Sequence, residues 1–208
     1  MKKLYPEFFR RVDEEPDALF YAQPRRVKHM DEAAARAAKA LYCEVLPPKL
    51  PVLDLMASYH SHLPASVGPV TGLGLNKAEL EDNEAVADVV VQDLNRDAHL
   101  PFGDAQFGGC VCTVSVQYMT RPDELFPEVA RVLQPGAPFI VTFSNRMFPT
   151  KAILAWRSSD DEAHIRLVET YFSLADFGET KSLYHTPEGG DPLYGVWAHK
   201  TAERPFLN

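Results

Sequence analysis

Short apolar runs alternate with amphipathic stretches between residues 50 and 144, and this alternation restricts the fold more than any other feature. The runs are rich in valine, leucine and phenylalanine, as strands buried on both faces are. They cover residues 50–56, 70–75, 88–92, 110–116 and 138–144. The stretches between them repeat with a helical period, most clearly after Pro122, where Leu125, Phe126 and Val129 form one stripe. Strands that alternate with helices predict a parallel sheet covered by helices.

The flanking segments complete this pattern. Residues 31–46 predict an alanine-rich helix and residues 150–157 a short helix, while residues 57–67 predict a short polar loop with a helix candidate. A capping box predicts a helix that begins at Ser159, and a second one places Asn76 before Glu79. Residues 177–184 and 193–199 predict a closing hairpin. We therefore expect one α/β domain with a doubly wound, Rossmann-like, seven-stranded and mostly parallel sheet that ends in an antiparallel C-terminal hairpin. In it, residues 1–48 form an N-terminal helical cap and residues 49–208 form the α/β core.

Charge and composition exclude several classes of protein. The chain carries 29 acidic and 21 basic residues, a net charge of −8, which argues against a binder of nucleic acid. No apolar run reaches the 18 residues that a membrane span needs, and the N-terminus lacks the apolar core of a secretion signal. The three cysteines form no C-x-x-C pair and are typical of a reducing compartment. We expect a cytoplasmic protein without a metal centre.

Polar side chains stand at the ends of four successive predicted strands. They are Asp54, Asn76, Asp93 and Ser115. In a doubly wound sheet, ligands bind at the carboxyl ends of the strands near the switch point, so these side chains are candidates for a ligand site. Each also has a structural alternative, such as a pinned turn at Asp54, a helix cap at Asn76 or an Asx turn at Asp93.

The segments that carry these residues resemble class I S-adenosylmethionine-dependent methyltransferases of the type 11 methyltransferase-domain kind. The resemblance covers roughly residues 50–146 and is most specific at QDL…LPF and at VLQPG before the fifth strand. It implies S-adenosylmethionine as cofactor and a small-molecule acceptor. It also implies cofactor contacts at Asp54, Met56, Ser58, Asn76, Gln92, Asp93, Leu94 and Ser115.

The chain departs from this family in two places. The family's first loop reads D-x-G-x-G-x-G, and here Met56, Ser58 and His60 replace the glycines. The acidic residue that ends the second strand, and in the family binds ribose hydroxyls, is replaced by Gly74. These departures leave two alternatives open: a catalytically inactive methyltransferase-like protein that binds an adenosyl ligand, and an enzyme that uses another adenosyl ligand.

Further side chains suit the chemistry of methyl transfer. His60 and Tyr118 are candidate catalytic residues, one as a base and one as an aromatic face for the sulfonium cation. Candidate acceptor-binding residues are Tyr21, Arg25, His29, Asn145 and Arg146. The two arginines could pair with an acidic acceptor. The pair His60 and His62 alone gives too few ligands for a metal-dependent hydrolase.

Overall fold

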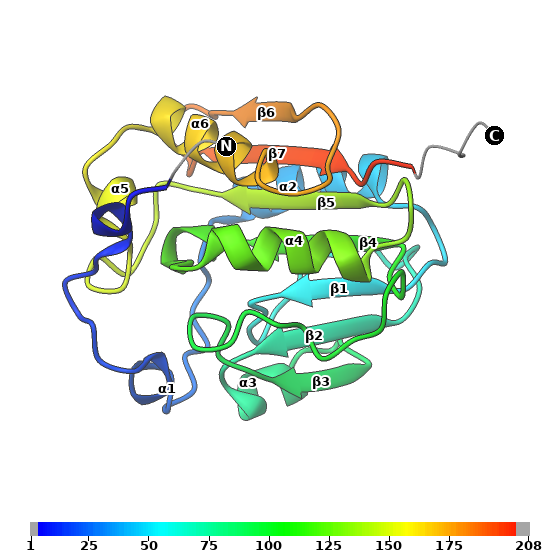
Figure 1. Cartoon of the computed structure of the whole chain (residues 1–208), viewed down its shortest axis with the longest axis horizontal. Coiled ribbons are helices and arrows are strands. Elements are labelled where there is room, and N and C mark those ends of the chain that lie inside the picture. Colours follow the sequence, from blue (N-terminus) through cyan, green and yellow to red (C-terminus); the bar gives the residue numbers. More distant parts are fainter. Residues whose placement is uncertain (1–3, 203–208) are drawn as a thin grey trace.

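The computed structural model describes residues 4–202 and contains one seven-stranded sheet in the order β3-β2-β1-β4-β5-β7-β6 (Figure 1). The strands are β1 (Val52–Leu55), β2 (Val70–Gly74), β3 (Asp88–Val91), β4 (Gly109–Thr113), β5 (Pro138–Phe143), β6 (Lys181–His185) and β7 (Leu193–His199). Strands β1 to β5 are parallel, and β7 lies antiparallel between β5 and β6. The predicted fold class and hairpin are confirmed.

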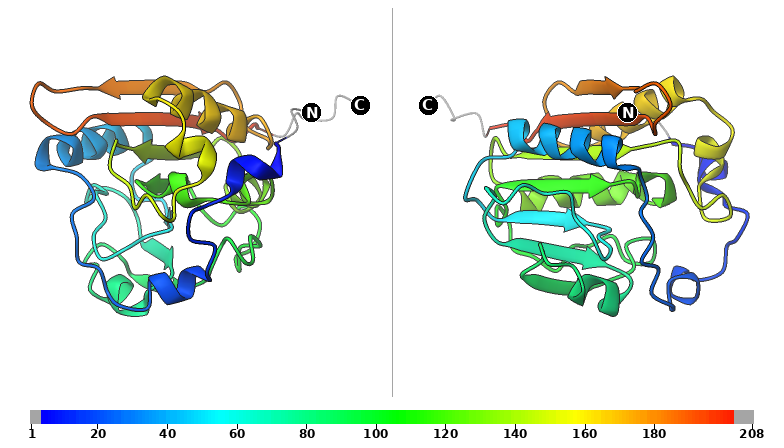
Figure 2. Two further views of the ribbon diagram at one scale, coloured as in Figure 1. Left: turned by 90° about the vertical axis from the view of Figure 1, so that its left-hand side faces the viewer. Right: turned by 180° about the vertical axis from the view of Figure 1, so that it is seen from behind.

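Helices cover both faces of the sheet. They are α1 (Asp17–Phe20), α2 (Glu32–Val45), α3 (Lys77–Glu81), α4 (Pro122–Val132), α5 (Leu154–Arg157) and α6 (Asp161–Phe172), with 3-10 turns η1 (Pro6–Phe9) and η2 (Val116–Tyr118). Helices α4 and α6 lie on one face and α2 on the other (Figures 1 and 2). Tyr42 anchors α2, because its hydroxyl pairs with Thr113 and Thr142 on the two central strands. Strands covered on both sides explain the continuous apolar runs in the sequence.

Three predicted local features are wrong. Residues 57–67 form only a loop with bends and turns, without the helix candidate, and α5 begins at Leu154 instead of residue 150. Helix α6 is capped by Asp160, whose carboxylate accepts from the Ala163 amide at 2.9 Å. The loop after β1 stays irregular because its groups bond to other elements: the Ala57 amide donates to the Leu73 carbonyl at 2.8 Å.

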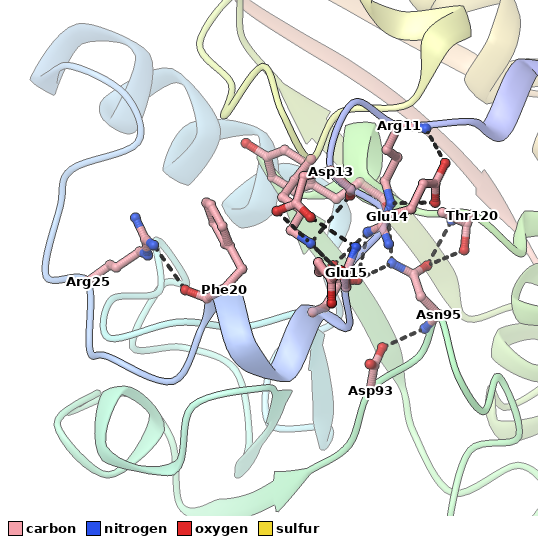
Figure 3. Close-up of polar contacts among 12 residues, drawn as sticks. Arg11, Asp13, Glu14, Glu15, Phe20, Arg25, Asp93, Asn95 and Thr120 are labelled. Atoms are coloured by element: carbon pink, nitrogen blue, oxygen red, sulfur yellow. Dashed lines mark hydrogen bonds and ion pairs between the residues drawn. The ribbon is translucent and has the colours of Figure 1, made fainter.

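A buried cluster of charges fixes the N-terminal arm, which we define as residues 11–31. Lys151 is 1% exposed and pairs with Asp13 and Asp17 at 3.1 and 3.2 Å. Arg11 donates to Asp17 at 2.6 Å, and the Asn95 amide donates to the same carboxylate at 2.8 Å (Figure 3). The cluster holds the arm across the carboxyl ends of the strands, on the left-hand side of Figure 1.

Candidate functional site

Two adjoining cavities lie at the carboxyl ends of the central strands, where the strand order reverses between β1 and β4. The larger has a volume of about 180 Å³ and the smaller about 80 Å³. They share the six residues His29, Met56, Ala57, Ser58, Val114 and Ser115. This is the position at which doubly wound sheets bind their ligands.

All eight residues predicted to contact a cofactor line these cavities. Asp54 lines the larger one, and Met56, Ser58 and Ser115 line both. The others line the smaller one: Asn76, Gln92, Asp93 and Leu94. The fold therefore brings together the ends of four strands that are well separated in the sequence.

The predicted catalytic and acceptor residues divide between the cavities and the rest of the surface. His60 lines the larger cavity, while Tyr21, Arg25 and Tyr118 line the smaller one and His29 lines both. Asn145 and Arg146 line neither of them. Instead, Arg146 pairs with Asp191 at 2.7 Å, and Asn145 accepts from the Ser144 hydroxyl. Arg146, which the sequence suggested as a partner for an acidic acceptor, is thus already paired with the loop between β6 and β7.

Asp54 is a buried carboxylate with one hydroxyl partner. Its side chain is 4% exposed and accepts from the Ser61 hydroxyl. No basic side chain in residues 4–202 forms an ion pair with it. Burial raises the pKa of Asp54 to about 6. A charge in this position is costly unless a cation from outside the chain meets it.

Two of the polar candidates already satisfy backbone groups of the protein. Asn76 caps α3 by accepting from the Glu79 amide at 3.1 Å, and its amide group donates to the Tyr21 carbonyl at 2.8 Å. The Gln92 amide donates to the Asp97 and His99 carbonyls at 2.9 and 2.7 Å. The predicted cap at Asn76 is confirmed, and the residue also holds the N-terminal arm.

Asp93 forms the predicted Asx turn but keeps one oxygen free. Its Oδ1 atom accepts from the Asn95 amide at 3.0 Å (Figure 3). None of the hydrogen bonds found in the described chain involves Oδ2. The side chain lines the smaller cavity, so the turn leaves an acceptor for a ligand there.

Two residues at the junction of the cavities hold left-handed backbone. Met56 has a φ of 57° and Val114 a φ of 46°, and they follow the neighbouring strands β1 and β4. Such φ values are uncommon for residues with a side chain and are an outlier for a β-branched one. Met56 stands where the family has its first glycine, so the chain keeps a glycine-like conformation without the glycine. Strain of this kind concentrates at functional sites.

The loop after β1 explains why the second strand ends in glycine. A Cβ atom at Gly74 would lie 2.2 Å from the Ala57 carbonyl oxygen, far inside van der Waals contact. No side chain fits there while the loop keeps its hydrogen bond from the Ala57 amide to the Leu73 carbonyl. An acidic residue at the end of β2 is therefore sterically excluded.

We expect Gly74→Ala to lower the free energy of unfolding by roughly 1–3 kcal/mol, the usual cost of overpacking. Urea denaturation measures the change. The matched control is Gly103→Ala, because the nearest atom to a Cβ there lies 3.8 Å away. Equal stability of the two variants would show that the loop moves aside freely.

Three histidines surround the larger cavity. Burial and the neighbouring His60 and His29 lower the pKa of His62 to about 4, and burial lowers the pKa of His29. Both side chains are therefore neutral near pH 7. Within residues 4–202, no group of three or more His, Cys, Asp or Glu side chains is arranged to hold a metal ion.

Several residues that no sequence pattern indicated also line the smaller cavity. Asp17, Glu79, Asn95 and Phe148 belong to this group. The sequence predicts Glu79 as half of a capping box, but its carboxylate does not accept from the Asn76 backbone amide. It accepts from the Arg25 amide at 2.5 Å and from the Ser58 hydroxyl at 2.6 Å. The one signal that marks Glu79 as a site residue is its burial, which the structure shows and the sequence does not.

The sheet order and the antiparallel hairpin are those of the class I methyltransferase fold, and the two cavities lie at its switch point. A family model described as "Methyltransferase domain" matches residues 56–141. This match spans less than half of the chain, and it supports the resemblance to class I methyltransferases over these residues.

A curated relative is the biotin biosynthesis bifunctional protein BioHC of Teredinibacter turnerae. It is 30% identical over 110 residues, and the match covers 52% of this chain but 19% of the relative. The chain thus matches about a fifth of that protein.

Solved structures share the fold. A SAM-dependent methyltransferase from Thermotoga maritima gives a TM-score of 0.60 at 15% identity, covering 81% of this chain and 91% of its own. The cyclase SpnF gives 0.62 at 15% identity, covering 87% and 89%. Proteins named as a methyltransferase and as a cyclase therefore share this fold, so the fold alone does not identify the reaction. In the described part of this chain, no helix has the length and apolar character needed to cross a membrane.

Proposed function

We propose that the chain binds S-adenosylmethionine in the two adjoining cavities and transfers its methyl group to a small-molecule acceptor. The observation that carries this proposal is Asp54, a buried carboxylate at the switch point without a cationic partner among the described residues. The amino group of S-adenosylmethionine is a cation that would balance this charge. The family match and the methyltransferase neighbours support the same choice of ligand.

The residues around the cavities fit the remaining parts of this cofactor. The free oxygen of Asp93 would accept from the exocyclic amine of adenine, and the buried Leu94 would pack on the ring. Bound S-adenosylmethionine supplies a methyl group on a sulfonium, which already contains its leaving group. The protein then has to align the acceptor and exclude water.

The N-terminal arm would perform this second task. It contributes Tyr21, Arg25 and His29 to the walls, and the Arg25 guanidinium stacks 4.0 Å from the centre of the Phe20 ring (Figure 3). Tyr21 and Tyr118 offer aromatic faces to a cation. The neutral His29, at the junction of the cavities, would act as a base for a protonated acceptor.

The inactive alternative rests on two observations. Met56 and the obstructed Gly74 alter two positions at which the family approaches its cofactor. A protein that binds an adenosyl ligand without transferring methyl groups would tolerate both changes.

Calorimetry with S-adenosylmethionine and S-adenosylhomocysteine tests the proposal directly. We expect saturable binding of both, together with transfer of a tritium-labelled methyl group to a component of a small-molecule extract. Binding without transfer to any fraction would favour the inactive alternative. The absence of binding to the folded chain would overturn both.

Asp93→Ala is expected to weaken the binding of S-adenosylhomocysteine by about 10- to 100-fold, because a hydrogen bond to a charged group contributes about 1.5–3 kcal/mol. The control is Asp97→Ala, an exposed acid in the same loop that bonds to the His99 amide. Titration calorimetry of the two folded variants makes the comparison. Unchanged affinity in Asp93→Ala would remove this residue from the site.

A further inference from the structure

Glu79 is the carboxylate in the smaller cavity that the proposed function leaves unexplained. Three acidic residues line this cavity: Asp17, Glu79 and Asp93. Asp17 is neutralised by Arg11 and Lys151 at 2.6 and 3.2 Å. Glu79 is 5% exposed and forms no ion pair within the described part of the chain. Such a group is retained at a cost unless hydrogen-bond donors surround it.

Its present donors satisfy half of its capacity. Oε1 accepts from the Arg25 amide at 2.5 Å, and Oε2 accepts from the Ser58 hydroxyl at 2.6 Å. An ionised carboxylate has about four acceptor positions, so about one position remains on each oxygen. Two adjacent acceptors on one planar group match two neighbouring hydroxyl donors, the arrangement of a vicinal diol.

The neighbouring positions offer no competing group for such a diol. Gly74, at the end of β2, has no room for a side chain, because the Ala57 carbonyl oxygen stands in its place. The side chain of Asn76 is already engaged at both ends: its Oδ1 accepts from the Glu79 backbone amide, and its Nδ2 donates to the Tyr21 carbonyl. Glu79 follows on α3, about one helical turn later, and reaches the same cavity.

We propose that Glu79 binds the two ribose hydroxyls of the adenosyl ligand through its unused acceptor positions. The carboxylate thus takes over, from a different place in the chain, a role that the backbone forbids at Gly74. Its other two hydrogen bonds tie the ligand to the loop after β1 and to the N-terminal arm. This inference rests on the proposed function only in assuming an adenosyl ligand, and it involves hydrogen bonding without proton transfer.

The test compares S-adenosylhomocysteine with its 2′-deoxy and 3′-deoxy analogues by calorimetry. Each hydroxyl donates to a charged acceptor, so we expect the unaltered chain to bind each analogue about 10-fold or more weakly than the parent compound. In Glu79→Gln this preference is expected to fall to about 3-fold or less. The amide can still accept from the Arg25 amide and donate to the Ser58 hydroxyl, so the loops keep their hydrogen bonds.

Glu81→Gln is the matched control, since Glu81 lies on the same helix, exposed, in an ion pair with Lys77. It is expected to retain the full preference. If Glu79→Gln does not fold, Glu79→Asp replaces it. Its preference for the parent compound over the deoxy analogues is expected to be weaker than that of the unaltered chain and of Glu81→Gln, but not lost.

The outcomes separate the two proposals. No binding of S-adenosylhomocysteine to the unaltered chain would overturn the proposed function. Tight binding without a preference for the diol, or a preference that persists after Glu79 is replaced, would overturn this inference alone. A purely structural role for Glu79 would lower the affinity for all three ligands equally.

Discussion

Asp54→Asn is expected to weaken the binding of S-adenosylhomocysteine by about 30-fold or more while making the unliganded fold more stable. Removing one partner of a desolvated charge pair costs about 2–5 kcal/mol of binding. The unliganded protein, in contrast, loses a buried charge whose partner in the structure is the hydroxyl of Ser61. The opposite signs of the two effects distinguish a ligand-binding carboxylate from a structural one.

The pH dependence of stability gives the second readout. The pKa of Asp54 is about 6 in the folded chain against an ordinary value of 3.8, so the folded state binds more protons between these values. Its contribution to stability therefore decreases as pH rises from about 4 to about 6, by up to about 3 kcal/mol. The asparagine variant lacks this decrease. In the unaltered chain, affinity for the ligand's ammonium group should rise over the same pH range as the carboxylate ionises.

The control for both readouts is Asp88→Asn, an exposed acid at the start of β3. It should change neither affinity nor the slope of stability against pH. Thermal unfolding from pH 4 to 7 and calorimetry at each pH measure the effects. Equal affinity of Asp54→Asn and the unaltered chain at pH 7 would contradict the assignment of Asp54 to the ammonium group.

Lys151→Met is expected to lower the free energy of unfolding by about 3–5 kcal/mol, the largest change in stability that the structure indicates. The ammonium group is buried, pairs with Asp13 and Asp17, and donates to the Glu15 carbonyl at 2.7 Å. Loss of one member of a buried ionic cluster leaves the remaining charges with fewer partners. Asp17 would then depend on Arg11 and on the Asn95 amide.

The matched control is Lys77→Met, because Lys77 is 70% exposed and pairs with Glu81 at 3.3 Å. Exposed pairs contribute about 0–1 kcal/mol, so this variant should unfold almost like the unaltered chain in urea. Release of the N-terminal arm should also speed cleavage by trypsin after Arg25 and Arg26. Identical stability of both variants would show that the cluster does not hold the arm.

Much of the fold follows from the period of the apolar residues. The apolar run that begins at residue 110 is typical of a strand covered on both faces, and its first part forms β4, which ends at Thr113 instead of residue 116. Helix signals between such runs then favour a parallel sheet. The same reasoning reaches the candidate site. Parallel strands place their carboxyl ends along one edge, so Asp54, Asp93 and Ser115 were expected to meet, and they line adjoining cavities.

Local patterns were less informative where a side chain bonds to a distant segment. Glu79 fits a capping box in sequence, yet its partners come from residues 25 and 58. Arg146 follows β5, which ends near the site, but its side chain forms an ion pair with Asp191 in the closing hairpin and lines neither cavity. Residues 57–67 included a helix candidate, but the backbone of this segment bonds to the neighbouring strand and to the segment before β1.

The sequence by itself determined the sheet, its closing hairpin and the strand ends that face the two cavities, because these depend on periodicity and on the direction of parallel strands. The tertiary structure alone decided which carboxylates stay unpaired, why Gly74 has no side chain and how the N-terminal arm closes the site. Those features depend on contacts between residues 17 to 160 positions apart, and no local pattern encodes such contacts.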